Sequence, residues 1–376
     1  MAEPRPGRPR RLALLLPDMR GGGAERVALR LAEDFLGAGH AVDLVLMEAR
    51  GELLDLLPSQ VRVFDLHAPR IRSAIAPLRR YLRERRPDAI QVSMWPLTVA
   101  AVIAHRLARS RARVVLSDHI VLSKQYAHFG VVRRLLRRLS IRLAYPLADA
   151  RVLVSRQAAD DLARISGISR DSIDVVYNPV SRPTAASQPV DAAALWGDAD
   201  GRIITVGSLK AQKNHALLIR SFARLRAKRR ARLLILGDGP LRGELEALVA
   251  SQGLSGEVLM PGFVTDPWPY YETADLFALS SDYEGYPLVL IEALRSGLTV
   301  VSTDCESGPR EILDGGRYGR LVPVGDEAAF AAAMEQALAG PGDPAPLQAR
   351  AEALSGQGTS DRYLQLMLGM GCQSDF

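Results

Sequence analysis

The chain has 376 residues, of which 48% are hydrophobic and 24% are charged, and this composition excludes a strongly disordered or collagen-like protein. The length predicts about two domains, at roughly 100–200 residues for each. Two cysteines, Cys305 and Cys372, are too few for a disulfide framework or a zinc-ligand set, so we expect both to be packing residues.

Charge is unevenly distributed along the chain. The net charge is +6, but residues 1–180 hold 30 Lys and Arg against 18 Asp and Glu, whereas residues 181–376 hold 18 against 24. A basic surface attracts the phosphates of a nucleotide, a nucleic acid or an anionic lipid leaflet, and charge alone does not choose among them. No apolar run approaches the roughly 20 residues that span a bilayer, so we expect a protein of the cytoplasm.

The first half of the chain alternates between strand-length apolar runs and segments of helical length. Residues 1–10, rich in Pro and Arg, predict a disordered leader. The run Leu12–Leu16 precedes Gly21–Gly23, a helical pattern over Ala24–Leu36 and a second strand at Ala41–Met47. This strand-helix-strand order indicates a parallel, doubly wound sheet, with further strands predicted at 89–93, 113–116 and 151–154.

The pattern breaks near Tyr177–Pro179, and Ser181–Gln188 is typical of an exposed connection. We therefore expect domains over residues 1–180 and 181–358. The second domain is also predicted to be doubly wound, with strands at 202–206, 232–236, 258–260, 276–279 and 299–302 and helices at 215–227, 241–251 and 288–296. The last segment, 359–376, contains a predicted helix at Ser360–Leu368 that could pack back on the first domain.

Two loops that follow predicted strands could bind phosphate. Gly21–Gly23 precedes a helix, where free N–H groups and the positive end of the helix dipole gather, but a tight turn explains the glycines equally well. Gly207–Asn214 carries Lys210 and Lys213 where doubly wound sheets bind ligands. These lysines could neutralise a diphosphate, although solvated loop charge is the ordinary role of lysine.

The most specific segment is Glu284–Glu292, with the sequence EGYPLVLIE. Pro287 favours a helix start, so we expect a helix from Leu288 whose free N–H groups face the ligand. Glu284 and Glu292 are spaced so that two carboxylates could accept hydrogen bonds from the hydroxyls of one sugar-containing ligand. The alternative is a capping acid and a surface acid.

These motifs occur in the order seen in one enzyme family. Glu284 and Glu292 together with Gly207–Asn214, Gly237–Pro240, Pro261–Phe263 and Gly308–Ile312 resemble the family-4 retaining glycosyltransferases of the GT-B fold, over about residues 202–325. In the first half, Gly21–Arg26, Ser117–His119 and Val176–Val180 are similar to the branch that builds bacterial lipopolysaccharide and capsular polysaccharide. The resemblance implies an α/β, GT-B architecture of two Rossmann-like doubly wound domains facing a cleft.

The resemblance also implies a reaction. It is the retaining, metal-independent transfer of a sugar from a nucleotide-sugar, which we expect to be a UDP-sugar, to a glycan acceptor that we expect to be lipid-linked. The nucleotide-sugar is a substrate, and no cofactor is implied. Lys213 would stabilise the departing diphosphate, Glu284 would hold hydroxyls of the transferred sugar, and Glu292 would bind the ribose.

His119, at the end of a predicted strand, would contact the sugar from across the cleft, although a lone histidine is more often structural. We group His119, Lys213 and Glu284 as catalytic candidates and assign no general base. The full set of implied donor-binding residues is Gly22, Gly23, Ser208, Lys210, Lys213, Glu284, Gly285, Tyr286, Pro287, Leu288, Val289 and Glu292.

Two positions qualify the resemblance. Many family members carry an arginine where this chain has Ser208, and Lys210 could replace it only as a point charge. Asp198-Ala199-Asp200 has the D-x-D spacing of metal-dependent glycosyltransferases of the other major fold, but it precedes a predicted strand. We interpret it as turn chemistry and expect no metal site.

The segment Val131–Leu143 predicts a basic amphipathic helix. Its apolar stripe could lie on a membrane or pack in a core with a solvated charged face, and its family connection favours the membrane. The membrane would then be an anionic surface at the inner face of the cytoplasmic membrane. The expected membrane contacts are Arg133, Arg134, Arg137, Arg138 and Arg142.

Three other functions are compatible with parts of the sequence. A nucleotide-sugar epimerase or hydrolase of the same fold would consume donor without acceptor, and a non-catalytic protein would only bind the nucleotide-sugar. A nucleic-acid-binding module should show aromatic stacking platforms and an RNA-binding motif. With only 6% aromatic residues and no such motif, we expect no nucleic-acid partner.

Overall fold

The computed structural model describes residues 8–20, 22–126, 129–180, 189–340, 342–356 and 358–370. Most of the expected leader, Gly21, the expected connection Ser181–Gln188 and Cys372 lie outside these residues. The chain divides into two compact units. Unit 1 comprises residues 1–179 and 357–376, and unit 2 comprises residues 180–356.

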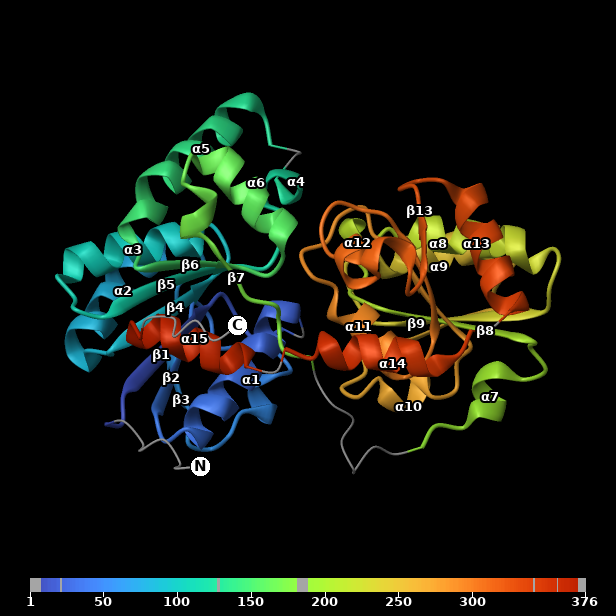
Figure 1. The fold of residues 1–376 in the computed structure, drawn as a ribbon, viewed down its shortest axis with the longest axis horizontal. Coiled ribbons are helices and arrows are strands. Elements are labelled where there is room, and N and C mark those ends of the chain that lie inside the picture. The colour runs from blue at the N-terminus through green and yellow to red at the C-terminus, as the bar shows by residue number, and fades with distance from the viewer. Residues whose placement is uncertain are drawn as a thin grey trace. The chain divides into compact units, whose positions relative to one another are not determined.

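The described part of unit 1 contains a seven-stranded parallel sheet in the order β3-β2-β1-β4-β5-β6-β7 (Figure 1). Its strands are β1 (Arg11–Leu16), β2 (Ala41–Leu46), β3 (Arg62–Asp65), β4 (Ala89–Ser93), β5 (Arg113–Asp118), β6 (Ala150–Leu153) and β7 (Asp174–Val175). The helices of this unit are α1 (Gly23–Gly37), α2 (Ile71–Arg85), α3 (Leu97–Ala108), α4 (Leu122–Gln125), α5 (Val131–Ala144), α6 (Arg156–Ser166) and α15 (Thr359–Leu368).

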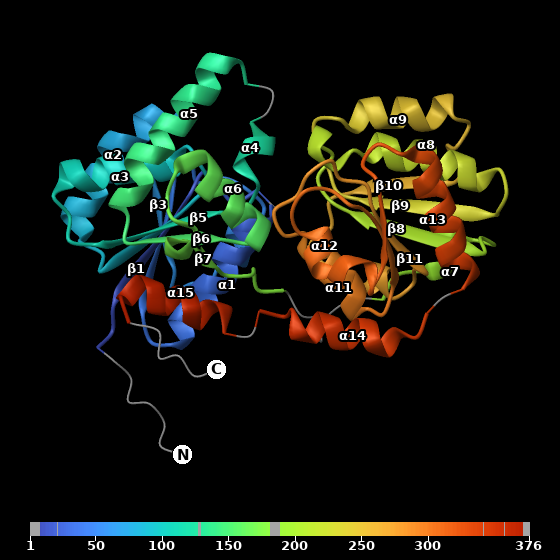
Figure 2. The ribbon, with the colours of Figure 1, turned by 45° about the horizontal axis from the view of Figure 1, so that its top comes forward.

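Strand β1 is apolar along its whole length because both of its faces are buried. Ala13 and Leu15 join a core that also contains side chains of α2, α3 and α6, whereas Leu12, Leu14 and Leu16 join a core on the other face with α1 and α15. Figures 1 and 2 show α1 and α15 together on this second face. A continuous apolar run is typical of a central strand in such a doubly wound sheet.

The described part of unit 2 contains a six-stranded parallel sheet in the order β10-β9-β8-β11-β12-β13 (Figure 2). Its strands are β8 (Gly201–Val206), β9 (Ala231–Leu236), β10 (Val258–Gly262), β11 (Leu276–Leu279), β12 (Thr299–Thr303) and β13 (Arg320–Val322). The helices are α7 (Ala192–Trp196), α8 (His215–Arg226), α9 (Arg242–Ser251), α10 (Trp268–Tyr271), α11 (Leu288–Arg295), α12 (Pro309–Ile312), α13 (Glu327–Ala339) and α14 (Pro344–Ala353).

Both sheets change direction of winding at one point. In unit 1 the order reverses between β1 and β4, and in unit 2 it reverses between β8 and β11. Ligands of open parallel sheets bind outside the carboxyl ends of the strands at this switch point. The predicted doubly wound α/β class is confirmed, and the switch point of unit 2 indicates a ligand site at the loops after β8 and β11.

The last helix of the chain belongs to unit 1. Tyr363 and Met367 of α15 lie in the second core of that unit, and the Arg113 Nε atom of β5 donates to the Leu366 carbonyl at 2.7 Å. No helix among the described residues is both long and apolar enough to cross a bilayer.

Candidate functional site

The loops after β8 and β9 are held together by backbone contacts at the carboxyl edge of the unit 2 sheet. Leu209 N donates to Asp238 O at 2.9 Å, and Gly207 N donates to Leu236 O at 2.9 Å. Gly237 has a φ of 143°, and a Cβ atom built there would lie 2.1 Å from Gly207 O. Only glycine fits this close approach, so the position of the Gly207–Asn214 loop is fixed by its neighbour.

Lys213 ends a short 3₁₀ turn over Ala211–Lys213 in this loop. Its Nζ atom lies 2.6 Å from Oε1 of Glu284, and the two side chains are 17% and 7% exposed. Asn214 follows in the left-handed region with a φ of 43°, and its side chain caps α8 by accepting from Leu217 N at 3.1 Å. The cap fixes the end of the loop directly beside Lys213.

Glu284 is held from several sides. Ser281 Oγ donates to Oε1 at 2.6 Å, and Gln212 Nε2 lies 3.5 Å from Oε2 while donating to Tyr283 O at 3.0 Å. A buried carboxylate is stable only when it is paired and hydrogen-bonded, and here a lysine, a hydroxyl and an amide provide that environment. Ser281 and Gln212 were not predicted from sequence as supports of Glu284. Gln212 lies in the Gly207–Asn214 loop, but its residue type alone indicates no role.

Helix α11 begins at Leu288 after Pro287, as predicted. Ser307 Oγ donates to Gly285 O at 2.7 Å, and Gly308 (φ 91°) packs so closely that an added Cβ would lie 2.4 Å from Pro287 Cδ. These contacts anchor the turn before the helix, where Gly285 and Tyr286 are buried and Leu288 and Val289 are half-buried. The first N–H groups of α11 therefore have a fixed place at the sheet edge.

The two glutamates of this segment are neither caps nor surface acids. Glu292 is 6% exposed and its Oε2 accepts from Tyr271 OH at 3.0 Å, and Glu284 is 5% exposed. No side chain caps α11 among the described residues. The alternative interpretation of the pair, stated from sequence, is therefore wrong.

Ser208 and Lys210 lie in the same loop as Lys213. Ser208 is half-buried and Lys210 is exposed. Lys210 therefore offers an exposed point charge and not the two-pronged guanidinium of an arginine. Beneath the loop, His215 is 3% exposed, and its pKa is lowered to about 4 by burial, with the charge of Lys213 acting in the same direction. His215 is neutral at pH 7 and adds no charge to the site.

The remaining predicted site residues belong to unit 1. Gly22 precedes α1 and Gly23 is its first residue, and a Cβ atom added at Gly23 would meet nothing within 4 Å. His119 follows β5, and its Nε2 atom lies 3.2 Å from Ser117 Oγ. Burial lowers the pKa of His119 to about 4, although Asn178 opposes this effect, so the ring is neutral at pH 7.

Family models of known proteins match both halves of the chain. The model of the family described as "Glycosyltransferase Family 4" matches residues 21–182, and that described as "Glycosyl transferases group 1" matches residues 200–340. An N-acetylgalactosaminyltransferase of Campylobacter jejuni, which by name acts on a diphospho-undecaprenol-linked substrate, is 30% identical over 84% of this chain and 87% of its own. The chain belongs to the family-4 glycosyltransferases.

Solved structures share its fold. The Anabaena protein Alr3699/HepE, in complex with UDP and glucose, superposes with a TM-score of 0.78 at 21% identity, covering 96% of this chain and 100% of its own. The lipopolysaccharide outer core galactosyltransferase WaaB gives a TM-score of 0.71 at 20% identity, with coverages of 96% and 99%. The GT-B fold expected from the sequence is confirmed.

The basic helix of this glycosyltransferase is α5, and it presents its apolar side chains to solvent. Val131, Val132, Leu135, Leu136, Leu139 and Leu143 are 48–73% exposed. Its described buried residues are Arg137, Ile141 and Ala144. The core-packing interpretation of the stripe is therefore wrong, because most of the leucines that would fill a core lie outside it.

Arg137 corrects one of the sequence predictions. Its side chain is 2% exposed, its Nη1 donates to Leu122 O at 2.8 Å, and its guanidinium lies 5.8 Å from the centre of the Tyr126 ring. Arg137 therefore ties α5 to the α4 region and does not reach a membrane. Arg133, Arg134, Arg138 and Arg142 are exposed, as the prediction requires.

The D-x-D segment lies at the other edge of the unit 2 sheet. Asp198 pairs with Arg230 at 3.0 Å, and Asp200 pairs with Arg229 at 3.2 Å, just before β8 begins. Among the described residues no group of three His, Cys, Asp or Glu side chains could hold a metal ion. Both acids of the D-x-D segment are occupied by arginines.

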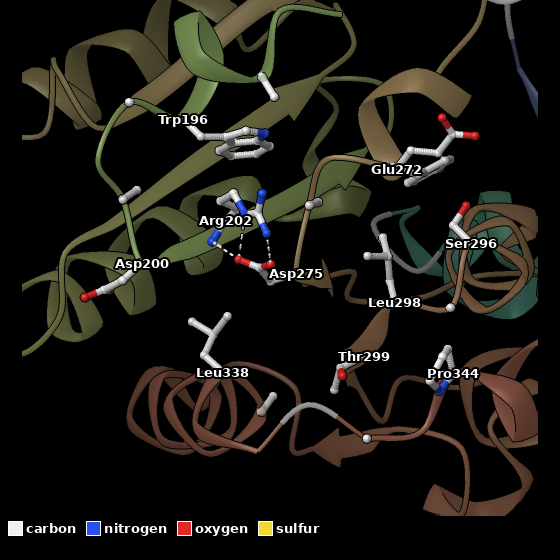
Figure 3. A pocket seen from close by; sticks show the side chains of 18 of the residues that line it. Trp196, Asp200, Arg202, Glu272, Asp275, Ser296, Leu298, Thr299, Leu338 and Pro344 are labelled. Carbon is white, nitrogen blue, oxygen red and sulfur yellow. Dashed lines mark hydrogen bonds and ion pairs between the residues drawn. The ribbon is translucent and has the colours of Figure 1, made fainter. Parts of the chain in front are cut away.

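An open pocket of about 770 Å³ lies at the same amino-terminal edge (Figure 3). It is lined by Trp196, Arg202, Asp275 and Leu298 among others. The backbone N–H and the guanidinium of Arg202 donate three hydrogen bonds to the Asp275 carboxylate. Asp200 and Glu272 also line it, so its lining carries a net negative charge that does not suit a diphosphate. Because Lys213 and Glu284 follow the carboxyl ends of β8 and β11, this pocket is separate from the candidate donor site.

Proposed function

We propose that this glycosyltransferase moves a sugar from a UDP-sugar to a lipid-linked glycan acceptor, with retention at the anomeric carbon and without a metal ion. The reaction would serve the synthesis of bacterial envelope polysaccharide or lipopolysaccharide. The Lys213–Glu284 pair carries the proposal, because it sets a cation and a hydroxyl acceptor side by side at the switch point of the sheet.

The pair has separate tasks once a donor is bound. Lys213 would exchange its contact with Glu284 for one with the diphosphate, and its charge would stabilise the negative charge that develops on the leaving group. Glu284 would accept hydrogen bonds from hydroxyls of the transferred sugar, while Ser281 and Gln212 keep its carboxylate in place. The N–H groups at the start of α11 add further donors for the phosphate.

In the proposed chemical step no side chain is needed as a general base. The bond between the anomeric carbon and the diphosphate oxygen breaks, and the acceptor oxygen bonds to the same carbon on the same face of the ring. The acceptor proton passes to the departing diphosphate, which leaves as the nucleoside diphosphate. In this proposal Gly22 and Gly23 bring backbone close to the ligand, and His119 contacts the sugar as a neutral ring.

The substrate classes rest on the relatives. The Campylobacter jejuni relative is named for transfer to a diphospho-undecaprenol-linked glycan, and a relative in Rhizobium meliloti, 35% identical over 47% of this chain and 53% of its own, is a lipopolysaccharide core biosynthesis glycosyltransferase. A UDP donor is supported by the Anabaena structure, which holds UDP and glucose.

The exposed face of α5 supports a lipid-linked acceptor. Four exposed arginines and six exposed apolar side chains share this helix, a combination that suits an anionic bilayer surface. We propose that the chain docks by α5 on the inner face of the cytoplasmic membrane, where it would meet its acceptor while collecting a soluble donor.

A donor panel tests the proposal. The purified protein is heated with UDP-, GDP- and ADP-sugars, and the donor that binds the native state should raise the unfolding temperature. We expect a UDP-sugar to do so and Glu284→Gln to reduce the shift. Protection by a GDP- or ADP-sugar alone would overturn the donor assignment, and donor turnover without acceptor would favour a hydrolase or an epimerase.

A further inference from the structure

Tyr363 of the last helix reaches the strand end that carries His119, 246 residues away from Ser117 in sequence. Its hydroxyl lies 3.0 Å from Ser117 Oγ, and Ser117 Oγ lies 3.2 Å from His119 Nε2. We propose that Tyr363 is a positioning residue that acts through Ser117 to fix the ring of His119. The inference rests on the proposed function of His119 as a sugar contact.

The first link of this chain is fully buried. Tyr363 and Ser117 are both 0% exposed, so the phenol has no water to bond and depends on Ser117. The pKa of Tyr363 is raised to about 12, chiefly by burial and also by the charge of Asp118, while the hydrogen bond with Ser117 opposes this rise. The hydroxyl therefore keeps its proton throughout the physiological range and can donate it to Ser117 Oγ.

The second link decides where the histidine carries its proton. A neutral imidazole has one N–H donor and one lone pair. If Tyr363 donates to Ser117 Oγ, the Ser117 proton is directed at His119 Nε2, which must then accept. In that case the imidazole proton stays on Nδ1. Nδ1 and the Oδ1 atom of Asn178 are both buried and have no hydrogen-bond partner among the described residues, and Asn178 favours the protonated ring.

Helix α15 is held in place by contacts that do not use the Tyr363 hydroxyl. Thr359 Oγ1 donates to Tyr177 O at 2.8 Å, and Arg362 pairs with Asp174 at 2.6 Å. Arg113 Nε donates to the Leu366 carbonyl at 2.7 Å. Removal of the hydroxyl should therefore leave the helix docked, and the effect on His119 can be measured in a folded protein.

The test is Tyr363→Phe in the full chain, followed by ¹H–¹⁵N NMR of the histidine side chains. His119→Gln identifies the signals of the ring by their loss. In the unsubstituted protein we expect one tautomer, protonated on Nδ1, and a pKa near 4. In Tyr363→Phe the Ser117 hydroxyl is free to turn, so the Nε2-protonated form should rise to a measurable population.

Tyr81→Phe is the matched control. It also removes a buried phenol hydroxyl from unit 1, the one that donates to Asp43 Oδ2 at 2.9 Å, and it should leave the His119 signals unchanged.

With a UDP-sugar the kcat of Tyr363→Phe should fall about five-fold, the change expected from one ordinary hydrogen bond, with the donor KM unaltered.

Each outcome is decisive. Unchanged His119 signals in Tyr363→Phe would overturn the inference and leave Tyr363 as a packing residue. If that variant does not fold, Ser117→Ala breaks the same chain and must give the same change of tautomer. Should His119→Gln turn over as fast as the unsubstituted protein, the sugar-contact role of His119 fails, while the NMR result still decides whether Tyr363 fixes the ring.

Discussion

Lys213 Nζ and Glu284 Oε1 lie 2.6 Å apart, although the two residues are separated by 71 positions in the sequence. Lys213 follows β8 and Glu284 follows β11, and these strands are neighbours in the sheet. Each side chain is the main charge partner of the other, so substitution of either one leaves a buried or half-buried charge without compensation.

The first prediction concerns two separate effects of this pair, one on turnover and one on the unfolding free energy of the protein. Lys213→Ala and Glu284→Ala should each lower turnover by at least about tenfold, because each removes charge stabilisation or sugar contact. Each single variant should also lose about 1–3 kcal/mol of unfolding free energy, the usual cost of an unsatisfied buried group.

The double variant Lys213→Ala/Glu284→Ala supplies the control. It removes both charges together, so its loss of stability should be smaller than the sum of the single losses, while turnover stays low. Urea unfolding and a radiolabelled UDP-sugar assay measure the two effects. Additive stability losses, or turnover at the unsubstituted rate in either single variant, would contradict the assignment.

The sequence predicted the centre of each sheet better than its edges. Strands such as β1 and β9 are continuous apolar runs because both faces are buried, and their positions were predicted within a residue or two. Strands β3, β7 and β13 were missed. They are short, and β3 exposes Val63 at 43%, so no apolar run marks them.

The site was predictable only in part, for a related reason. Local features gave the loop of Lys213 and the helix start after Pro287, because turn residues and proline act over a few positions. The partners of Glu284, and the link from Tyr363 to Ser117, depend on strand order and on the return of the last helix. The exposure of the α5 leucines could not be predicted, since an apolar stripe has the same sequence in a core and on a surface.

The second prediction concerns the glycine that joins the loops after β8 and β9. Gly237→Ala places a methyl group 2.1 Å from Gly207 O at a φ of 143°, so we expect lower stability and a weaker thermal shift with UDP-sugar. Gly243→Ala is the control, because Gly243 lies in α9 with nothing within 4 Å of an added Cβ. There alanine should stabilise the helix by about 0.5–1 kcal/mol. Equal effects of the two changes would show that the loops adjust freely.

The third prediction is a pH dependence of the stability of unit 1. Burial raises the pKa of Asp118 to about 6, against an ordinary value near 3.8, and lowers that of His119 to about 4 from 6.5. Between pH 4 and 6 the native state therefore binds more protons at Asp118 than the unfolded state, and this contribution to stability is lost as the pH rises. His119 has the opposite effect. Between pH 6.5 and 4 the unfolded state binds more protons at His119 than the native state does, so the stability that the neutral ring contributes is lost as the pH falls below about 6.5.

Asp118→Asn removes the titrating carboxyl and leaves only the pH effect of His119. Acidification from pH 6.5 to 4.5 should then destabilise unit 1 more steeply, by up to about 1.4 kcal/mol per pH unit. Urea unfolding followed by the fluorescence of Trp95 measures this, in a chain whose Trp196 and Trp268 are replaced by Phe. Parallel pH profiles for the two proteins would show that Asp118 ionises normally.

The fourth prediction is that EDTA leaves sugar transfer intact. In the proposed site Lys213 and the first backbone N–H groups of α11 would bind the diphosphate, and a lysine can supply the compensating charge that a metal supplies elsewhere. The assay compares turnover before and after chelation. A loss of activity that Mg²⁺ or Mn²⁺ restores would contradict metal independence and would return attention to Asp198 and Asp200, which would have to leave Arg230 and Arg229.

The fifth prediction is that α5 binds anionic membranes. The exposed residues Arg133, Arg134, Arg138 and Arg142 face solvent on the same helix as the exposed leucines. Each basic residue near an anionic surface contributes about 1 kcal/mol, and the apolar side chains add a contribution that salt does not screen. The protein should therefore sediment with phosphatidylglycerol vesicles, and only weakly with phosphatidylcholine vesicles.

Two paired variants test which charges matter. Arg134→Glu/Arg138→Glu reverses two exposed charges on α5 and should remove most of the binding, whereas Arg79→Glu/Arg83→Glu makes the same change on the exposed face of α2 and should not. Leu135→Ser/Leu139→Ser should weaken the part of the binding that survives ~0.5 M salt, where screening is short-ranged. Equal binding to neutral vesicles would mean that the arginines of α5 contribute nothing to membrane binding. Sedimentation that the arginine pair and the leucine pair of α5 both leave untouched would mean that α5 does not meet the membrane.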